Sequence, residues 1–144
     1  MSNSNYGSDF YAWANEQAAL LRAGRLGHAD IEHIAQEIES MGRTEKRELI
    51  SRLRVLILHL LKWKFQPTGR GSSWRASIRV QRLDLAEHLN DNPSLKAILP
   101  QAIATAFAAA VIEAADQTGL PESALPSSSP WAFDEMMDAR FWPS

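Results

Sequence analysis

The sequence predicts an all-α fold, a single-domain bundle of about five to six helices over residues 1–144. Apolar residues recur at helical spacing in one segment after another, and glycine, proline and asparagine turns separate the segments. No segment shows the strict alternation of a confident β-strand. Of the 144 residues, 45% are hydrophobic, which is enough for one compact core.

Two apolar stripes, each followed by a glycine, predict the first two helices. Residues 9–23 form the first, with Ser8 as its N-cap and Gly24 as the left-handed residue that ends it. Residues 28–41 form the second, which we expect Gly42 to end. The apolar stripe of this second helix consists of Ile31, Ile34, Ala35, Ile38 and Met41.

The third and fourth helices are predicted to form an antiparallel hairpin at the centre of the bundle. Thr44 is the expected N-cap of a helix over residues 45–65. From Leu53 onward its apolar residues lie nearly all round the helix axis, which is typical of a central helix. The loop 66–72, with one proline and two glycines, leads to a fourth helix over residues 74–90.

The C-terminal third is predicted to contain a fifth, alanine-rich helix over residues 100–118, with Phe107 and Ile112 as its main large packing groups. Residues 120–130 hold three prolines and three consecutive serines and are expected to be irregular. A short last helix then leads to residues 140–144. The aromatic side chains of this tail favour docking back on the bundle, because a free tail would expose them to water.

Composition excludes several classes of function. The chain has no cysteine, which excludes disulfides, thiolate metal sites, iron–sulfur clusters and thiol nucleophiles. Residues 1–8 are polar and uncharged, so we expect them to be flexible and not a secretory signal. The longest nearly apolar run, residues 102–112, is too short to span a bilayer. We therefore expect a cytoplasmic protein with no membrane contact and no cofactor.

The charged residues are unevenly distributed along the chain. Between residues 43 and 82 there are eleven Lys or Arg residues and only two acids, a balance of +9, although the whole chain has a net charge of −2. Such a segment is typical of a surface that meets nucleic acid or another polyanion. The alternative is that the acidic helices fold against it and form ordinary surface ion pairs.

Several motifs occur in order along nearly the whole chain. They are Asp9–Trp13 (DFYAW), Ile34–Gly42 (IAQEIESMG), His59–Trp63 (HLLKW), Ser73–Arg75 (SWR), Ile78–Arg82 (IRVQR) and Thr118–Pro121 (TGLP). Together they resemble an uncharacterised bacterial family, the domain-of-unknown-function family twenty-nine, in which a glutamate is expected at the position of Gln36. The resemblance implies an all-helical fold, and it brings no activity and no site residues.

His59 is the first candidate side chain, because its neighbours on the predicted helix are almost all apolar. The hairpin brings it to the level of Gln81, a polar residue on the inner stripe of the fourth helix. Buried polar groups need hydrogen-bond partners, so we expect His59 and Gln81 to face each other and bond directly or through a water. The functional alternative is that His59 is a general base or a ligand.

Basic and hydroxyl side chains form the second candidate, an anion-binding or partner-binding site at the start of the fourth helix. Its residues are Arg70, Ser73, Arg75, Arg79 and Arg82. The last three fall on one side of the helix, and a helix N-terminus attracts anions. These arginines could instead pair with Glu37, Glu39 or the acidic C-terminal segment.

The sequence supports neither a metal site nor a catalytic site. His33 with Glu37, and His28 with Glu32, have the i,i+4 spacing of two ligands on one helix face, but two ligands do not make a site. There is no His-Glu-x-x-His motif, no nucleophile elbow and no phosphate-binding glycine loop. We therefore predict no catalytic residues and no metal.

These observations predict an interaction module, not an enzyme, which uses its arginine-rich helix face to bind an acidic protein or another anionic partner. Nucleic-acid binding by the same face is one alternative. An enzyme that acts on an anionic small molecule, with His59 in a pocket, is the other. The sequence leaves the identity of the partner and the oligomeric state open.

Overall fold

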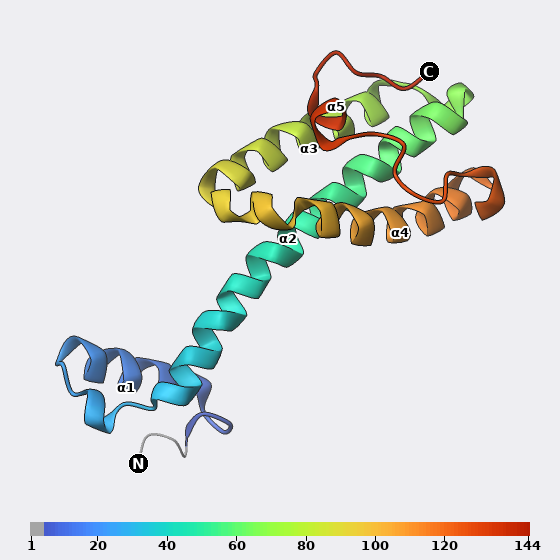
Figure 1. Cartoon of the computed structure of the whole chain (residues 1–144). Coiled ribbons are helices and arrows are strands. Elements are labelled where there is room, and N and C mark those ends of the chain that lie inside the picture. The colour runs from blue at the N-terminus through green and yellow to red at the C-terminus, as the bar shows by residue number, and fades with distance from the viewer. Residues whose placement is uncertain (1–4) are drawn as a thin grey trace. The chain divides into compact units, whose positions relative to one another are not determined.

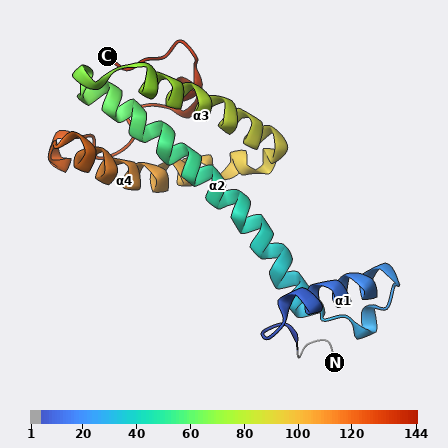
Figure 2. The same ribbon diagram turned by 180° about the vertical axis from the view of Figure 1, so that it is seen from behind.

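The computed structural model describes residues 5–144, and in this range it contains helices and no strand (Figures 1 and 2), which confirms the predicted all-α fold. The expected flexibility of residues 1–4 concerns residues outside this range. The α-helices are α1 (Phe10–Arg22), α2 (Ile31–Phe65), α3 (Ser72–Asp91), α4 (Leu99–Thr118) and α5 (Phe133–Met137). Short 3₁₀ turns are η2 (Leu26–His28), η3 (Pro67–Gly69), η4 (Pro93–Ile98) and η5 (Glu122–Ala124). The chain divides into two compact units, Met1–Thr44 and Glu45–Ser144.

Helix α2 runs unbroken from Ile31 to Phe65, so the expected helix end at Gly42 is wrong. Gly42 does not take the left-handed conformation that ends a helix, and a glycine inside a helix costs only about 1 kcal/mol. Thr44 does not act as an N-cap. Its hydroxyl donates to the carbonyl oxygen of Ser40, 3.1 Å away, as threonines inside helices do.

The helix ends predicted from glycine are confirmed at two other positions. Gly24 follows α1 with φ 73°, and Gly119 ends α4 with φ 78°, both in the left-handed region that favours glycine. The N-cap of α1 is Asp9, not Ser8, because the Asp9 carboxylate accepts a hydrogen bond from the Ala12 amide over 3.1 Å.

In the unit Glu45–Ser144, the C-terminal part of α2 and helix α3 form the predicted antiparallel hairpin (Figures 1 and 2), joined through η3. Contacts between the two helices show the direction. His88, near the end of α3, lies against Glu45, whereas Asp84, one turn earlier, forms an ion pair with Arg52 over 2.9 Å. Residues later on α2 thus meet residues earlier on α3.

The core of this unit is built around α2, as its apolar residues predict. Leu53, Leu56, Ile57, Leu60 and Leu61 are all fully buried. Helix α4 lies along α2 (Figures 1 and 2) and contributes small side chains and Phe107. The expectation for Ile112 is wrong, since its side chain is 58% exposed.

The stretch Pro93–Thr118, which covers η4 and α4, is long and apolar enough to cross a membrane by length and composition alone. Its apolar character comes largely from alanine. One side of α4 belongs to the core through Ala102, Ala106, Phe107, Ala110 and Ala114. Only 22% of the apolar window is buried, and a single helix of this kind is weak evidence for a membrane span.

The C-terminal segment lies on the hairpin (Figure 1), with α5 beside α3. Met136 of α5 is fully buried, and the Trp142 ring packs on Trp63 with 4.7 Å between ring centroids. Residues 120–130 contain the single turn η5 and no longer helix. This segment places backbone carbonyls and the Trp142 ring against Arg82 of α3, and the Pro143 carbonyl against Arg70, which precedes α3.

Candidate functional site

The structure places Arg82 inside the protein, although the sequence puts it on the outward face of the helix with Arg75 and Arg79. Only 6% of Arg82 is exposed. Its Nε donates to the carbonyl oxygen of Met136, and its Nη2 donates to that of Phe141, each over 2.7 Å. Arg82 therefore holds the C-terminal segment against α3, and its partners are backbone carbonyls, not the carboxylates that we considered.

The surroundings of the Arg82 guanidinium leave part of its charge unmatched. Burial lowers the pKa of Arg82, and the nearby Asp138 carboxylate opposes this effect. The Trp142 ring lies 5.3 Å from the guanidinium, within the range of a cation–π contact. Nη1 is buried and has no hydrogen-bond partner. Buried donors are usually satisfied, so this atom can still donate a hydrogen bond to an anionic oxygen.

Arg70 holds the other end of the same segment. Its Nε donates to the Trp63 carbonyl over 2.6 Å, and its Nη2 donates to the carbonyl of Pro143 over 3.3 Å. Its guanidinium also lies 5.4 Å from the Trp63 ring. Of the five predicted anion-binding residues, Arg70 and Arg82 are thus occupied with backbone carbonyls of the chain itself.

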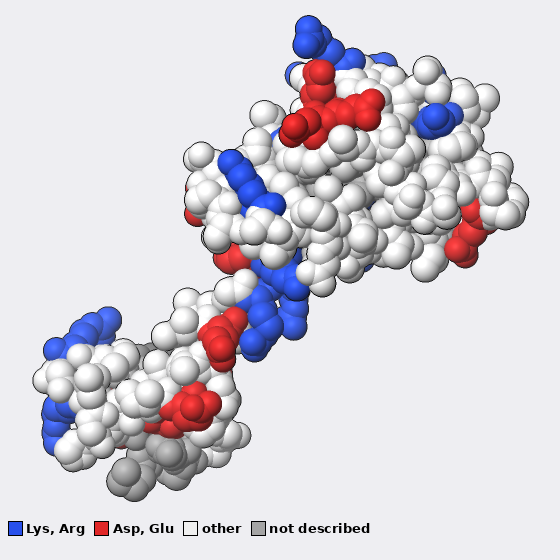
Figure 3. All heavy atoms as spheres, viewed as in Figure 1, with Lys and Arg blue, Asp and Glu red and all other residues white. Residues whose placement is uncertain are grey.

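Ser73, Arg75 and Arg79 are exposed. The Arg75 guanidinium lies 5.6 Å from the Trp63 ring. On the face drawn in Figure 3, Lys and Arg side chains of Glu45–Ser144 occupy small, separate areas within a mostly uncharged surface, not one continuous basic area. The predicted basic face is therefore reduced to two exposed arginines one turn apart on α3, beside an apolar area.

That apolar area is a groove of about 350 Å³ between α3 and the C-terminal segment. We call it the α3–α5 groove, and its lining residues are Arg79, Arg82, Leu83, Ala86, Met137 and Ala139. Leu83 is 71% exposed, and Val80 on the same helix is 49% exposed. The groove thus combines apolar side chains with two guanidinium groups, one exposed and one buried.

His59 and Gln81 form no direct hydrogen bond in the part of the chain that the structure describes. His59 Nδ1 lies 2.8 Å from the carbonyl oxygen of Val55, one turn earlier on α2. The pKa of His59 is lowered, mainly by burial and further by the Lys62 cation. The contact with the Val55 carbonyl opposes this effect but does not cancel it. Oε1 of Gln81 is buried without a partner. A bridge between the two side chains through water stays a prediction.

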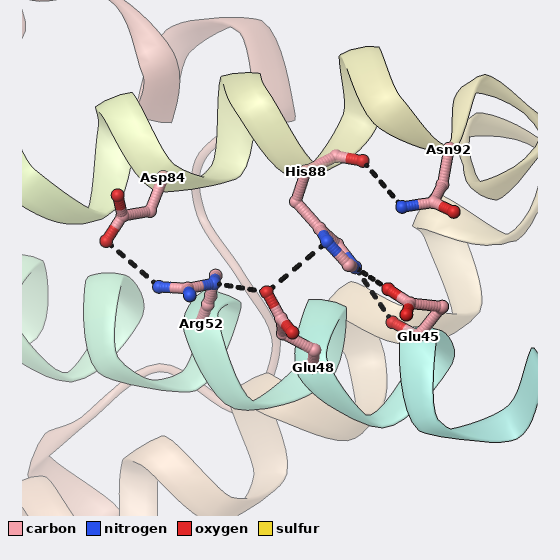
Figure 4. A network of polar contacts seen from close by, with 6 residues as sticks. All are labelled: Glu45, Glu48, Arg52, Asp84, His88 and Asn92. Atoms are coloured by element: carbon pink, nitrogen blue, oxygen red, sulfur yellow. Dashed lines mark hydrogen bonds and ion pairs between the residues drawn. The ribbon is translucent and has the colours of Figure 1, made fainter. Parts of the chain in front are cut away.

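A polar network that the sequence does not indicate joins α2 to α3 (Figure 4). Arg52 contacts Glu48 over 3.0 Å and Asp84 over 2.9 Å. His88, only 6% exposed, directs Nε2 to the Glu45 carbonyl oxygen at 2.9 Å and Nδ1 to the Glu48 carboxylate at 3.3 Å. These residues lie far apart in the sequence and come together only because the hairpin is antiparallel.

Glu45, Glu48 and His88 have ligand atoms within 4.8 Å of one another, as a metal site requires. However, the Glu48 oxygen that faces His88 also receives the Arg52 guanidinium. Arg52 thus already supplies positive charge at this carboxylate, and Nε2 of His88 is directed at the backbone carbonyl of Glu45. The arrangement is that of a structural ion-pair network between two helices.

In the unit Met1–Thr44, His33 and Glu37, which have the spacing of two metal ligands, each contact a different residue. His33 Nδ1 lies 2.8 Å from the Asp30 carboxylate, and Glu37 accepts a 2.5 Å hydrogen bond from the Tyr6 hydroxyl. Burial raises the pKa of Asp30, but hydrogen bonds from His33 and Trp13 outweigh it, so the pKa falls below its usual value. His28 and Glu32 lie in η2 and in the first turn of α2, respectively.

Comparison with known proteins gives one match. The model of the family described as "Domain of unknown function DUF29" matches residues 5–142, which is nearly the whole chain. Neither the curated proteins nor the solved structures contain a match to the chain.

Proposed function

Since the chain belongs to the DUF29 family, whose description carries no activity, we propose a function from its own surface: it is an interaction module that binds an acidic protein segment. The segment would lie in the α3–α5 groove, with apolar side chains against Leu83 and Met137 and carboxylates against Arg79. A cytoplasmic location without membrane contact is part of this proposal.

The groove carries the proposal through its combination of shape and chemistry. Soluble proteins rarely leave large apolar side chains in a concave site without a use for them, and Leu83 is 71% exposed there. Arg79 at the edge favours a negatively charged partner. Arg82 adds a buried cation whose Nη1 has no hydrogen-bond acceptor. A carboxylate of the partner would supply one after a small shift of side chains.

Asp138 is the acid whose charge raises the pKa of Arg82, but its carboxylate binds other groups. Its carboxylate accepts a hydrogen bond from the Arg140 amide over 2.9 Å and lies 3.6 Å from the Arg140 guanidinium. The Arg140 amide is the main reason why the pKa of Asp138 is lowered. The negative charge of Asp138 thus acts on the Arg82 guanidinium, but Asp138 does not accept a hydrogen bond from Nη1 of Arg82.

Selection from a displayed library of random peptides tests the proposal. We expect the bound peptides to combine Asp or Glu with Leu, Ile or Phe, and to bind Arg79→Glu and Leu83→Gln at least tenfold more weakly than the wild-type chain. Lys96→Glu is the matched charge control and Ile112→Gln the matched apolar control, because both residues are exposed outside the groove. Equal binding to all four variants would exclude the groove.

Nucleic-acid binding by the same arginines is the alternative function. Arg75 and Arg79 are its exposed contacts, and its affinity should fall steeply as salt rises. Retention of the chain on immobilised DNA or RNA at low salt, lost in an Arg75→Gln/Arg79→Gln variant, would favour it over the acidic segment. An enzyme centred on His59 would require a ligand to reach a half-buried imidazole whose Nδ1 already contacts Val55.

A further inference from the structure

In the unit Met1–Thr44, helix α2 contacts α1 and its preceding turn through polar side chains. Asp30 just before α2 receives Trp13 Nε1 over 3.0 Å, and its own amide donates to Gln17 over 2.7 Å. The Tyr6 ring stacks on His33 with 3.9 Å between ring centroids. The contacts that hold α1 and its preceding turn to α2 are therefore largely polar.

The predicted apolar stripe lies beside these polar contacts on the same part of α2, and the structure leaves it largely uncovered. Ile31 is 54% exposed, Ile38 61% and Met41 67%, while Ile34 is half-buried. We call these four residues the 31–41 stripe. Their successive spacings of three, four and three residues are those of the a and d positions of a coiled coil, which pack knobs-into-holes against an equivalent helix.

The described part of this unit has no apolar core of its own that would account for its apolar surface. Its buried residues are Trp13, Gln17 and Asp30, two of which are polar. Seven of the ten exposed large hydrophobic residues belong to it: Phe10, Tyr11, Leu21, Leu26, Ile31, Ile38 and Met41. A unit of this size without disulfides or a larger core is usually stabilised by association.

We propose that the 31–41 stripe is the interface of a homodimer, in which α1 and the first part of α2 from two copies form a four-helix arrangement. Three of the seven exposed side chains of this unit belong to the stripe and four to α1 and η2. At on the order of 100 Å² each, all seven would provide about 700 Å² per copy, close to the roughly 800 Å² per partner of a stable interface, so the dimer must cover α1 as well as the stripe. Heptad spacing makes the stripe complementary to itself, so a second copy supplies the matching surface.

Charge excludes an anionic membrane as the occupant of the stripe. Residues 1–44 contain six acids and three bases, and Glu32 and Glu39 lie close to the stripe. Amphipathic helices that bind membranes carry the opposite sign on their polar face. Because both copies are acidic here, added salt should leave the dimer unchanged or strengthen it, whereas binding of an acidic peptide to the α3–α5 groove should weaken.

Sedimentation of the full chain tests the proposal. We expect twice the chain mass of 16.1 kDa for the wild-type protein, the single-chain mass for Ile38→Glu, and the doubled mass for the control Ile112→Glu, whose side chain is similarly exposed on α4. A wild-type protein that stays at the single-chain mass at about 100 µM would overturn the proposal. So would an Ile38→Glu variant that remains a dimer.

Cross-linking decides the question if Ile38→Glu does not fold. The chain has no cysteine, so a single introduced cysteine reports only its own contacts. Under mild oxidation, Ile38→Cys should cross-link to itself if the two helices are parallel. A mixture of Ile31→Cys and Met41→Cys should cross-link if they are antiparallel, with Ile112→Cys as the control in both cases. If neither cross-link exceeds that of Ile112→Cys, the stripe is not the interface.

Discussion

The Arg82 guanidinium donates to the carbonyl oxygen of Phe141 over 2.7 Å, across 59 positions of sequence. A second hydrogen bond of equal length, to the Met136 carbonyl, holds α5 against the same side chain. One buried arginine on α3 thus fixes both the last helix and the tail that follows it. Its loss should release the segment that forms one wall of the α3–α5 groove.

Arg82→Met tests this role, because it keeps most of the aliphatic stem and removes the guanidinium. Two carbonyl oxygens lose their donor, and we expect a loss of about 2–4 kcal/mol in the free energy of unfolding. Urea denaturation measures it, and acrylamide quenching should show a more accessible Trp142. The matched control, Arg79→Met, changes an exposed arginine one turn away and should stay within about 0.5 kcal/mol of the wild type.

Gly69→Ala should destabilise the turn between α2 and α3. A Cβ at this position would collide with the Trp74 ring, coming within 2.8 Å of Cζ2 and closer still to Cη2. The ring must move out of its packed position, which typically costs about 1–3 kcal/mol. Gly71→Ala is the control, since nothing lies within 4 Å of its Cβ. Trp74→Leu should remove most of the penalty of Gly69→Ala in a double variant, and an additive pair would show that the collision is not the cause.

His59 should make the protein less stable as the pH falls below about 6.5, the usual pKa of histidine in an unfolded chain. Burial lowers the pKa of His59 in the folded state, so the unfolded state binds the proton more readily. The stabilisation is complete above the unfolded pKa and is lost between that value and the lower folded one. The free energy of unfolding of His59→Leu should depend less on pH in this window, and NMR titration of the imidazole should give a pKa below 6.5. A pKa at or above 6.5 would contradict this prediction.

The ion pair between Arg52 and Asp84 should contribute little to stability. Their side chains are 32% and 37% exposed, and pairs in such positions usually couple by about 0.2–1 kcal/mol. A double-mutant cycle with Arg52→Ala and Asp84→Ala measures this coupling, which should decrease with added salt. A coupling well above 1 kcal/mol that persists at high salt would instead mean that the whole network of Figure 4 acts as one unit.

Periodicity predicted the helices well because apolar spacing is a local property of the chain. It indicated α2 as the central helix and placed Gly24 and Gly119 at helix ends. The prediction of a helix end at Gly42 was wrong, because the helix-forming residues on both sides of this glycine keep α2 continuous. The Thr44 side chain has two local alternatives, an N-cap or a bond to the preceding turn, and the sequence does not distinguish them.

The candidate site was less predictable, because it depends on the path of the C-terminal segment. A helical wheel assigns Arg82 to the same side as Arg75 and Arg79, but the C-terminal tail covers only Arg82. The sequence does not predict the contacts of His88, because its partners Glu45 and Glu48 lie some forty residues earlier. The signal that could have found it is its i,i+3 and i,i+4 spacing to Leu85 and Asp84, which put it on the inner side of its helix.

Recognition of main-chain oxygens by Arg70 and Arg82 has a consequence for how this protein can vary. The two arginines contact carbonyl groups of residues 136, 141 and 143, and every amino acid offers that group. Substitutions at Asp138, Ala139 and Arg140 should therefore be accepted in evolution more readily than a deletion there. Losing a single residue would shift the register and leave both guanidinium groups facing the wrong atoms.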